Sequence, residues 1–551
     1  MVNLEEKFKL SDLDRLALDD IIDNPEALTS KKSLEQLKRS IAKQYRLKRY
    51  FANSQIILRA KERDIDPLEH PWLANLNKKP ARSISGVSIV AVMIPPKNSC
   101  PFDCAYCPSS ENAPRSYIGH EPSTLRAINS NYDPFAITKL RIEQLRSIGH
   151  AASKIHVVVQ GGTFLALHNE EQDRIMKGIY DGILAVDDKN QDYDTILRPS
   201  RSIEEAIHLC ETSITRNVGT TFETRPDVCK PRHIDRMLKL GGTWIELGIQ
   251  ALSDEIYLKV NRGHTILDVK RSIQLVKDAG YKVSVHMMPN LLSKPEEDIK
   301  YFKELYKNQD YKPDGLKIYP LLILPSTRLY DDWKNGILDP EPYDDDTLVK
   351  TLATIKDSVP EYTRIHRIQR DIPGKYVEAG LKLGNLRNIV KDYMHDYEMR
   401  CSCIRCRELG QVMNLGNYTP GENITLTEES YSASNGKEWF LSFIEEHSRV
   451  LFGFLRMRFP SQNAHRSEIT PSSAIIRELH IYGQEVVIGT KPKEAIHAQH
   501  RGLGKKLLER SEEIAKESGY DKMVIISGIG VRDYYRKYGY TLDGPYVSKK
   551  L

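Results

Sequence analysis

Three cysteines in one short run have the spacing of iron-sulfur ligands. Cys100, Cys104 and Cys107 lie in the stretch Ser-Cys-Pro-Phe-Asp-Cys-Ala-Tyr-Cys-Pro, directly after an apolar segment typical of a strand. Three thiolates can hold three corners of a four-iron cluster, which leaves the fourth iron open to bind and reduce a small molecule. The alternatives are a zinc site, which normally has four protein ligands when structural, and three incidental core cysteines. The pattern favours a catalytic [4Fe-4S] cluster and radical chemistry.

A second cysteine triplet is typical of a zinc site. Cys401, Cys403 and Cys406 are soft, closely spaced ligands in a polar stretch, and tetrahedral zinc is commonly bound by such thiolates. The fourth ligand must come from elsewhere, and of the two candidates, His366 and His395, we favour His366. A second cluster or three unligated thiols are the alternatives. Zinc here would stiffen a junction between domains.

A glycine-containing loop near the C-terminus could bind a pyrophosphate. The loop runs from Gln499 to Gly504 and opens an amphipathic helix. Free backbone amides at the helix start, together with Lys505, would face the anion. A strand at 475–481 precedes the loop and a tyrosine pair at 534–535 follows it. This order suits an acyl-coenzyme A site, with pantetheine on an open strand edge and a tyrosine protonating the leaving thiolate. The alternative is that the tyrosines only pack.

The residues between these motifs predict a partial barrel. From about 87 to 324, short β-branched runs alternate with longer amphipathic stretches, which indicates βα units and a parallel sheet. Function in such folds gathers where strands end, and Gly161, Gly162 and Glu223 stand at such ends. The glycine pair alone could also be a plain turn. The six expected strands are 87–94, 155–162, 219–225, 243–250, 282–289 and 315–324.

A basic segment near the N-terminus could bind RNA. Leu34, Leu37, Ile41 and Tyr45 recur at helical spacing and predict a docked helix. Cations interleaved with aromatic residues can contact phosphates and stack on unpaired bases, although a solvated helix face is the ordinary alternative. The expected RNA contacts are Lys38, Arg39, Lys43 and Arg46.

Length and composition limit the class of protein. A chain of 551 residues exceeds what one core usually serves, so two or three domains are expected. We find no apolar run long enough to span a bilayer and no secretory signal, so no membrane partner is expected. Clustered cysteines suit metal chemistry in a reducing compartment, and a cytoplasmic location is expected. The net charge of +5 is too small to prove a nucleic-acid partner.

Several distinct stretches carry a family resemblance. They are Tyr-Ile-Gly-His-Glu-Pro-Ser-Thr-Leu-Arg-Ala-Ile (117–128), Glu-Thr-Arg-Pro-Asp (223–227), Asn-Arg-Gly-His-Thr (261–265), His-Met-Met-Pro (286–289), Asp-Gly-Leu-Lys-Ile-Tyr-Pro (314–320) and Gln-Arg-Asp-Ile-Pro (369–373). With them the chain resembles the catalytic subunit of Elongator, in the single-protein form found outside eukaryotes. One departure is the first cysteine gap, which has three residues where many relatives have more.

The resemblance implies an α/β architecture in four parts. A basic helical tRNA-binding segment would span 1–85, a partial (β/α)6 radical S-adenosylmethionine barrel 86–385, a zinc-binding linker 386–420, and a GNAT-type α+β acetyltransferase domain 421–551. The family modifies wobble uridine in tRNA anticodons. A 5′-deoxyadenosyl radical would take hydrogen from the acetyl methyl of acetyl-coenzyme A, and the carbon radical would attack uridine C5. Thioester hydrolysis would then leave a carboxymethyl group.

The resemblance also implies roles for individual residues. Lys154 would contact acetyl-coenzyme A, and Tyr534 and Tyr535 are the candidate proton donors. Further cofactor-binding candidates are Gly161, Gly162, Glu223, Glu478, Leu479, His480, Ile481, Gln499, Gly502, Leu503, Gly504, Lys505 and Tyr535. Expected partners are the tRNA anticodon stem-loop, a reductant or electron-donor protein, and a second copy of the chain as a candidate homodimer.

Two other functions compete with this one. A protein lysine acetyltransferase with a structural iron-sulfur cluster would use Glu478 to deprotonate the amine. A tRNA-binding scaffold would have both sites degenerate, although the intact cysteine triplets and the complete loop count against it. Adding a carbon unit to an unactivated aromatic carbon is beyond ordinary acyl transfer but accessible to a carbon radical, which favours the radical enzyme.

Overall fold

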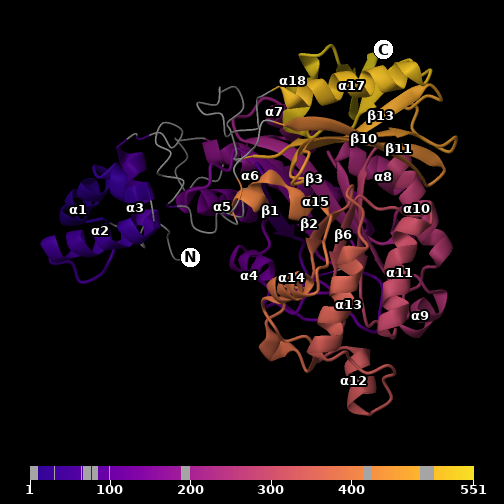
Figure 1. Cartoon of the computed structure of the whole chain (residues 1–551), viewed down its shortest axis with the longest axis horizontal. Helices are drawn as coiled ribbons and strands as arrows, with labels where there is room; N and C mark the ends of the chain where they lie inside the picture. Colours follow the sequence, from indigo (N-terminus) through magenta and orange to yellow (C-terminus); the bar gives the residue numbers. More distant parts are fainter. Residues whose placement is uncertain are drawn as a thin grey trace.

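Three parts follow one another along the chain (Figure 1). The computed structural model describes residues 10–29, 31–63, 65, 76, 85–97, 100–187, 199–414, 418, 423–483 and 502–551. A helical N-terminal lobe comes first, a parallel sheet wrapped by helices second, and a mixed sheet with its own helices last. Among the described helices we find none with the length and apolar character that a bilayer crossing requires.

The N-terminal lobe has a small core of its own. It contains α1 (Asp12–Ile22), α2 (Lys31–Gln44) and α3 (Asn53–Glu62). Ser11 starts α1 through a capping box with Asp14, which satisfies two backbone amides that the helix start leaves free. Leu34 and Ile41 of α2 are buried in this core, so the predicted amphipathic helix is confirmed.

The second part is a seven-stranded, all-parallel sheet. Five of the six predicted strands are present within three residues of their expected bounds, whereas the predicted strand 315–324 is divided into a barrel strand at 315–318 and a short strand of another sheet at 322–323. A seventh strand, β8, closes the order. The strands are β1 (Ser88–Met93), β2 (Lys154–Gln160), β3 (Arg216–Thr224), β4 (Trp244–Gln250), β5 (Lys282–Met287), β6 (Gly315–Ile318) and β8 (Arg364–Arg367).

The strand β8 was missed because its sequence lacks a strand signal. It reads Arg-Ile-His-Arg, and only Ile365 is fully buried. An edge strand with one apolar face and polar flanks has little β propensity of its own. Pairing with β6 forms it, through the register Gly315 to Arg364. The number of parallel strands was therefore set by tertiary pairing.

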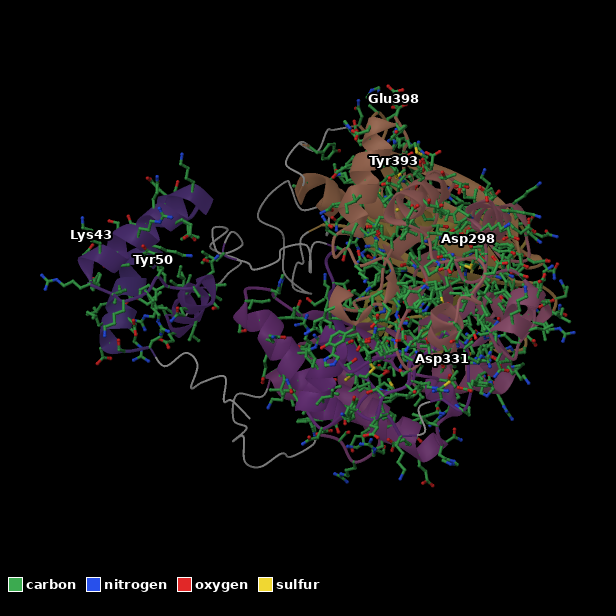
Figure 2. The ribbon with its side chains drawn as sticks, turned by 90° about the horizontal axis from the view of Figure 1, so that it is seen from below. Lys43, Tyr50, Asp298, Asp331, Tyr393 and Glu398 are labelled. Carbon is green, nitrogen blue, oxygen red and sulfur yellow. The ribbon has the colours of Figure 1, made fainter. Side chains whose placement is uncertain are left out.

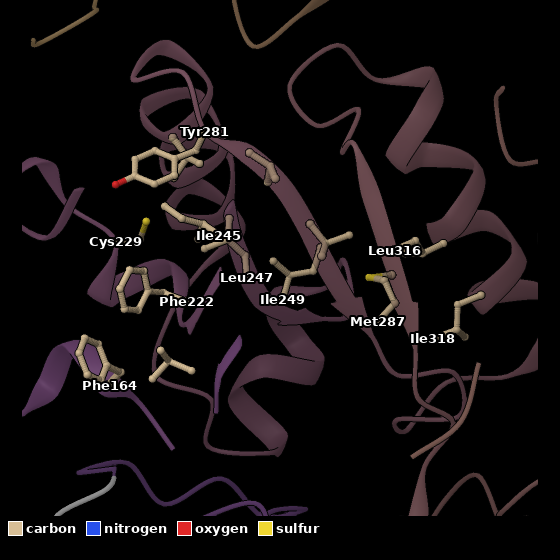
Figure 3. Packing of buried hydrophobic residues seen from close by; sticks show 14 of the residues in the cluster. Phe164, Phe222, Cys229, Ile245, Leu247, Ile249, Tyr281, Met287, Leu316 and Ile318 are labelled. Carbon is tan, nitrogen blue, oxygen red and sulfur yellow. The ribbon is translucent and has the colours of Figure 1, made fainter. Parts of the chain in front are cut away.

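Helices cover the outside of this sheet, and apolar strand residues fill the space between (Figure 3). Phe222, Ile245 and Leu316 come from three different strands and are fully buried in one cluster. The strand register places all three side chains on one face of the sheet, and the helices cover that face. The helices are α4 (Pro122–Asn129), α5 (Pro134–Ser147), α6 (Asn169–Leu184), α7 (Ile203–Cys210), α8 (Pro231–Lys239), α9 (Asp254–Lys259), α10 (Ile266–Asp278), α11 (Pro295–Lys307), α12 (Arg328–Lys334) and α13 (Asp345–Asp357). Two short strands, β7 (Leu322–Ile323) and β9 (Ala379–Gly380), form a separate antiparallel sheet. In the chain, β7 follows β6 and β9 follows β8.

The connector between the sheets is helical. It contains α14 (Leu386–Asp396), α15 (Ile404–Arg407) and α16 (Leu409–Asn414). The amide of Ile404 donates to the carbonyl of Thr363, just before β8, over 2.9 Å. The second cysteine triplet is therefore attached directly to the edge of the barrel sheet.

The third part is a seven-stranded mixed sheet. Its order is β10-β11-β12-β13-β14-β16-β15, and only β13 and β14 run parallel. Their pairing ends at Ile476 and Ile525, so residues 477–481 of β13 have no partner on that side among the described residues. The elements are β10 (Ile424–Ala433), β11 (Gly436–Glu445), β12 (Leu451–Phe459), β13 (Ser473–Ile481), α17 (Leu503–Glu517), β14 (Lys522–Ile525), α18 (Arg532–Arg536), β15 (Thr541–Asp543) and β16 (Tyr546–Lys550).

Buried charges join the two sheets. Arg477 of β13 donates to Asp314, just before β6, over 2.6 and 2.7 Å, and to Glu438 of β11 over 2.7 Å. Arg458 of β12 donates to Asp278, at the end of α10, over 2.7 and 2.8 Å. Each of these side chains is at most 1% exposed. Because a buried charge without its partner is strongly unfavourable, the network holds the sheets in one arrangement.

Replacing one member of this network should lower the urea concentration at which the protein unfolds. Arg477→Met leaves Asp314 and Glu438 short of a partner, and breaking a buried pair costs about 3–5 kcal/mol. We expect a clearly lower urea midpoint, followed by tryptophan fluorescence. The matched control is Arg174→Met, whose partner is the half-exposed Glu171 and whose loss should cost about 1 kcal/mol or less. Equal midpoints for the two variants would contradict a stabilising role for the network.

Candidate functional site

The first cysteine triplet lines a cavity at the ends of the barrel strands. Cys100, Cys104 and Cys107 are free thiols in the loop after β1, and all three face a cavity of about 530 Å³. The loop is held by backbone bonds, since Ala105 donates to Val260 and Leu329 donates to Ala105. We call this space the cysteine cavity. Three thiols that face one cavity are a suitable donor set for three corners of a [4Fe-4S] cluster with one open iron.

Two arginines contact the middle cysteine. Arg225 Nη1 and Arg262 Nη1 each donate to Cys104 Sγ over 3.4 Å. Burial opposes ionisation of this thiol, but the charges of Arg262 and Arg225 lower its pKa below the ordinary value. Burial and the neighbouring Cys104 instead raise the pKa of Cys107 to about 11. The surroundings of Cys104 therefore favour its thiolate form, whereas those of Cys107 oppose it.

A pair of glycines, Gly161 and Gly162, follows β2 beside the same cavity. Gly161 has φ +109°, and a Cβ there would lie 2.9 Å from Cγ of Pro114. Gly162 also has a positive φ. Gly162, Thr163 and Glu223 all line the cysteine cavity. Thr163 Oγ1 is 3.3 Å from Cys100 Sγ. Only glycine fits at 161 without displacing its neighbours, which is a requirement of packing, whereas Gly162 faces the cavity.

A second, larger cavity lies between the sheets. It has a volume of about 1760 Å³ and is lined by Lys154 of β2 together with the unpaired end of β13. We call it the interdomain cavity. The predicted acyl-coenzyme A residues Glu478, Leu479, His480, Ile481, Gly502, Leu503, Gly504, Lys505, Tyr534 and Tyr535 all line it. Gln499 lies outside the described residues.

The two predicted tyrosines differ in their surroundings. Tyr534 is half-buried, and its hydroxyl would lie 2.8 Å from a Cβ at Gly504, beside the start of α17. Tyr535 is buried in the core of the C-terminal sheet. Burial raises the pKa of both hydroxyls, and for Tyr534 the neighbouring tyrosines add to the effect. Tyr534 therefore has the more accessible hydroxyl at the loop.

A charged cluster forms the wall between the two cavities. Glu246 of β4 lines both of them. Its carboxylate contacts Lys317 Nζ and lies 3.0 Å from His286 Nε2, while Lys317 Nζ also lies 3.2 Å from Glu223. Burial opposes the charge on Glu246, but Lys317 holds the pKa of that carboxyl well below its usual range. Glu246 was not predicted, although a lone acid within an apolar strand is a signal for a functional residue.

The second cysteine triplet converges, but its expected histidine does not join it. The thiols of Cys401, Cys403 and Cys406 lie within 4.8 Å of one another. His366 Nε2 instead lies 3.2 Å from Ser284 Oγ, and its ring packs edge-on against Trp244. The prediction of His366 as fourth ligand was wrong, because β8 directs its ring toward the barrel. The alternative His395 is 89% exposed beside Asp396, and within the described ranges no fourth ligand joins the three thiols.

One of the four expected RNA contacts is part of a core. Lys38 is 5% exposed, and its ammonium contacts Glu35 over 3.0 Å and Asn53 over 2.5 Å. It fastens α2 to α3, so its prediction as an RNA contact was wrong. Arg39, Lys43 and Arg46 remain exposed. Figure 2 shows Lys43 at the outer surface of the lobe, with Tyr50 nearby.

Comparisons with known proteins agree with this architecture. Residues 94–306 match the radical SAM superfamily, and residues 313–396 match the radical SAM C-terminal domain. The tRNA uridine(34) acetyltransferase of Methanocaldococcus jannaschii is 41% identical over 563 residues, covering 100% of both chains. Elongator complex protein 3 of Drosophila melanogaster is 40% identical over 492 residues, covering 87% of this chain and 86% of that protein.

A solved structure extends the similarity to three dimensions. The archaeal Methanocaldococcus infernus Elp3, with an N-terminal deletion of residues 1–46, superposes with a TM-score of 0.74 at 39% identity. The match covers 85% of this chain and 100% of that one. The partial barrel followed by an α+β domain is thereby confirmed. The chain belongs to the family of the tRNA uridine(34) acetyltransferases and Elongator complex protein 3, within the radical SAM superfamily.

Proposed function

We propose that this protein is a radical enzyme that adds an acetyl-derived group to C5 of the wobble uridine in tRNA anticodons. The observation that carries this proposal is the shared wall between the cysteine cavity and the interdomain cavity. Gln160 and Glu246 line both spaces. A sulfonium cosubstrate on one side and a thioester on the other would meet across these residues.

The cysteine cavity supplies the radical part of the chemistry. When bound to Cys100, Cys104 and Cys107, a [4Fe-4S] cluster supplies the electron for reductive cleavage of S-adenosylmethionine at its open iron. The chain's own residues bind and orient the cosubstrate. Gly162 allows close approach to the end of β2, and Glu223 offers a carboxylate at the end of β3 to the cosubstrate ammonium.

The interdomain cavity supplies the acyl part. The free amides at the start of α17 and the charge of Lys505 suit the pyrophosphate of acetyl-coenzyme A. The unpaired end of β13 offers backbone groups to the pantetheine amides. Lys154 reaches the same space from the barrel side. Hydrogen abstraction breaks a carbon-hydrogen bond of the acetyl methyl, and that methyl carbon would then bond to uridine C5. Loss of the C5 proton and of one electron, with the oxidised cluster as the electron acceptor, would restore the uracil ring.

We further propose that zinc binds Cys401, Cys403 and Cys406. Three thiols within 4.8 Å of one another are a suitable donor set. The triplet lies near β8 and the start of β12. Glu408, two residues after Cys406, forms a β-bridge with Leu451 of β12 and accepts a hydrogen bond from Arg364 of β8. Bound zinc would therefore stiffen the junction between the two sheets.

The lysine acetyltransferase alternative is weaker on this geometry. Its base would be Glu478, but this carboxylate accepts a hydrogen bond from Arg456 Nε over 2.9 Å and is 8% exposed. This ion pair already occupies the carboxylate that the reaction would need as its base. The cysteine cavity would also have no use in that reaction.

Loss of one cluster ligand should abolish radical formation without abolishing RNA binding. We expect anaerobic Cys104→Ser protein, supplied with tRNA, S-adenosylmethionine, acetyl-coenzyme A and dithionite, to form no 5′-deoxyadenosine and no modified uridine. It should bind tRNA as well as the parent protein, since the exposed cations lie on another lobe. Cys210→Ser is the control, because Cys210 is buried outside both triplets. Turnover by Cys104→Ser, or acetyl-lysine formed by the parent without deoxyadenosine, would rule out the proposed mechanism.

The exposed N-terminal cations should contribute to tRNA affinity. Replacing Arg39, Lys43 and Arg46 with Ala should weaken binding and flatten its salt dependence, by a slope of about 0.7–0.9 for each lost phosphate contact. The measurement is the tRNA dissociation constant at a series of salt concentrations.

The control for this experiment replaces three exposed lysines of α11, namely Lys300, Lys303 and Lys307. This helix lies on the side of the barrel away from the N-terminal lobe (Figure 1). Equal losses in the two triple variants would remove the lobe from the RNA-binding surface.

A further inference from the structure

The sulfur of Cys104 lies between two buried guanidinium groups. Arg225 and Arg262 are 4% and 6% exposed, and each places Nη1 3.4 Å from Cys104 Sγ. Hydrogen bonds and charges at a ligating sulfur are among the factors that set the reduction potential of a cluster. The two arginines come from different segments, after β3 and after α9. Tertiary structure alone brings them to one sulfur.

Each arginine is held in place by contacts that do not involve the cysteine. Arg225 stacks over Phe102 at 3.6 Å and donates to both carboxylate oxygens of Asp227 over 3.0 Å. It also donates to the carbonyl of Arg262. Arg262 donates in turn to the carbonyl of Gly248 in β4. The donors are therefore preorganised at the sulfur and need not move when the charge there changes.

The two arginines differ in their counter-charge. Arg225 has the carboxylate of Asp227 as its partner. Arg262 makes no salt bridge within the part of the chain that the structure describes, and the acceptors it does have are a carbonyl and the sulfur of Cys104. Asp227 acts on it only from a greater distance. The cysteine loop therefore has one compensated and one uncompensated buried cation beside it.

We propose that Arg262, and more weakly the Arg225–Asp227 pair, raise the reduction potential of the cluster through Cys104. The inference rests on the proposed function, because it requires the cluster on Cys100, Cys104 and Cys107. One electron from an external low-potential reductant adds one negative charge to the cluster and its thiolates. A fixed cation in a low-dielectric site stabilises that added charge. Arg262 and Arg225 are thus positioning residues that act through the ligand sulfur.

The sign of the effect depends on which charge is removed, and this gives the test. Arg262→Gln removes the cation and leaves a neutral amide on a shorter side chain, so it should lower the ratio of reduced to oxidised cluster about tenfold at a fixed solution potential. For a one-electron couple, tenfold is 59 mV. Asp227→Asn is nearly isosteric and releases the charge of Arg225, so it should raise the ratio. Arg262→Lys keeps the charge and should stay close to the parent protein.

The measurement is an anaerobic redox titration of reconstituted full-length protein, followed by electron paramagnetic resonance of the reduced cluster. Iron and sulfide are counted in every sample. Arg174→Gln, an exposed arginine on α6, is the matched control and should not shift the ratio. Opposite shifts in Arg262→Gln and Asp227→Asn support the proposal, because a merely structural role would move both in one direction. Shifts of the same sign, or ratios within twofold of the parent in both variants, would overturn it.

Two further outcomes are also decisive. If Arg262→Gln assembles no cluster, Asp227→Asn decides alone, with an increased ratio in support and an unchanged ratio against. If the parent protein assembles its cluster and cleaves S-adenosylmethionine but the ratios do not move, only this inference fails. A parent protein that binds no iron under anaerobic reconstitution contradicts the proposed function and this inference together.

Discussion

The buried ion network between the sheets is the constraint on which the candidate site depends. Asp314 belongs to the barrel, and Arg477 and Glu438 belong to the C-terminal sheet, yet all are fully desolvated in one cluster. An apolar interface of the same size would tolerate sliding, whereas fully buried charges require their partners at hydrogen-bond distance. Because Arg477 is the first residue of the unpaired end of β13, the network fixes that edge in the cavity that Lys154 also lines. The interdomain cavity is a consequence of this docking.

The wall between the cavities combines charge with separation. The carboxylate of Glu246 contacts both Lys317 and His286, so its charge is paired between the two spaces. A carbon radical needs a path to its target that excludes stray hydrogen-atom donors. Such paired side chains can separate two cosubstrates, and small changes in their conformation can open a path between the cavities. This arrangement is consistent with radical chemistry that begins in one cavity and ends in the other.

The N-terminal lobe follows a different logic, because it has its own small core. Arg39 and Lys43 lie on α2, Arg46 lies in the turn that follows it, and all three are exposed. Lys38 is a cation on the same helix, but its ammonium donates hydrogen bonds to Glu35 and Asn53. The chemical type of a side chain therefore says less about RNA contact than the packing that surrounds it.

The sequence by itself determined the local features of this protein. The helical period of Leu34 and Ile41 and the β-branched runs predicted elements that the structure contains. The spacing of Cys100, Cys104 and Cys107 predicted radical chemistry, which the match to the radical SAM superfamily supports. These signals are short-range, because ligand spacing and amphipathic period are properties of neighbouring residues. The family motifs carried the rest of the functional interpretation.

Only the tertiary structure decided which of these elements meet. It added β8, turned His366 away from the cysteines, buried Lys38, and placed Arg262 against Cys104 from a segment 158 residues further along the chain. No local pattern contains such information. Long-range contacts depend on how sheets pair and how buried charges find partners, and those are settled by the packing of the whole chain.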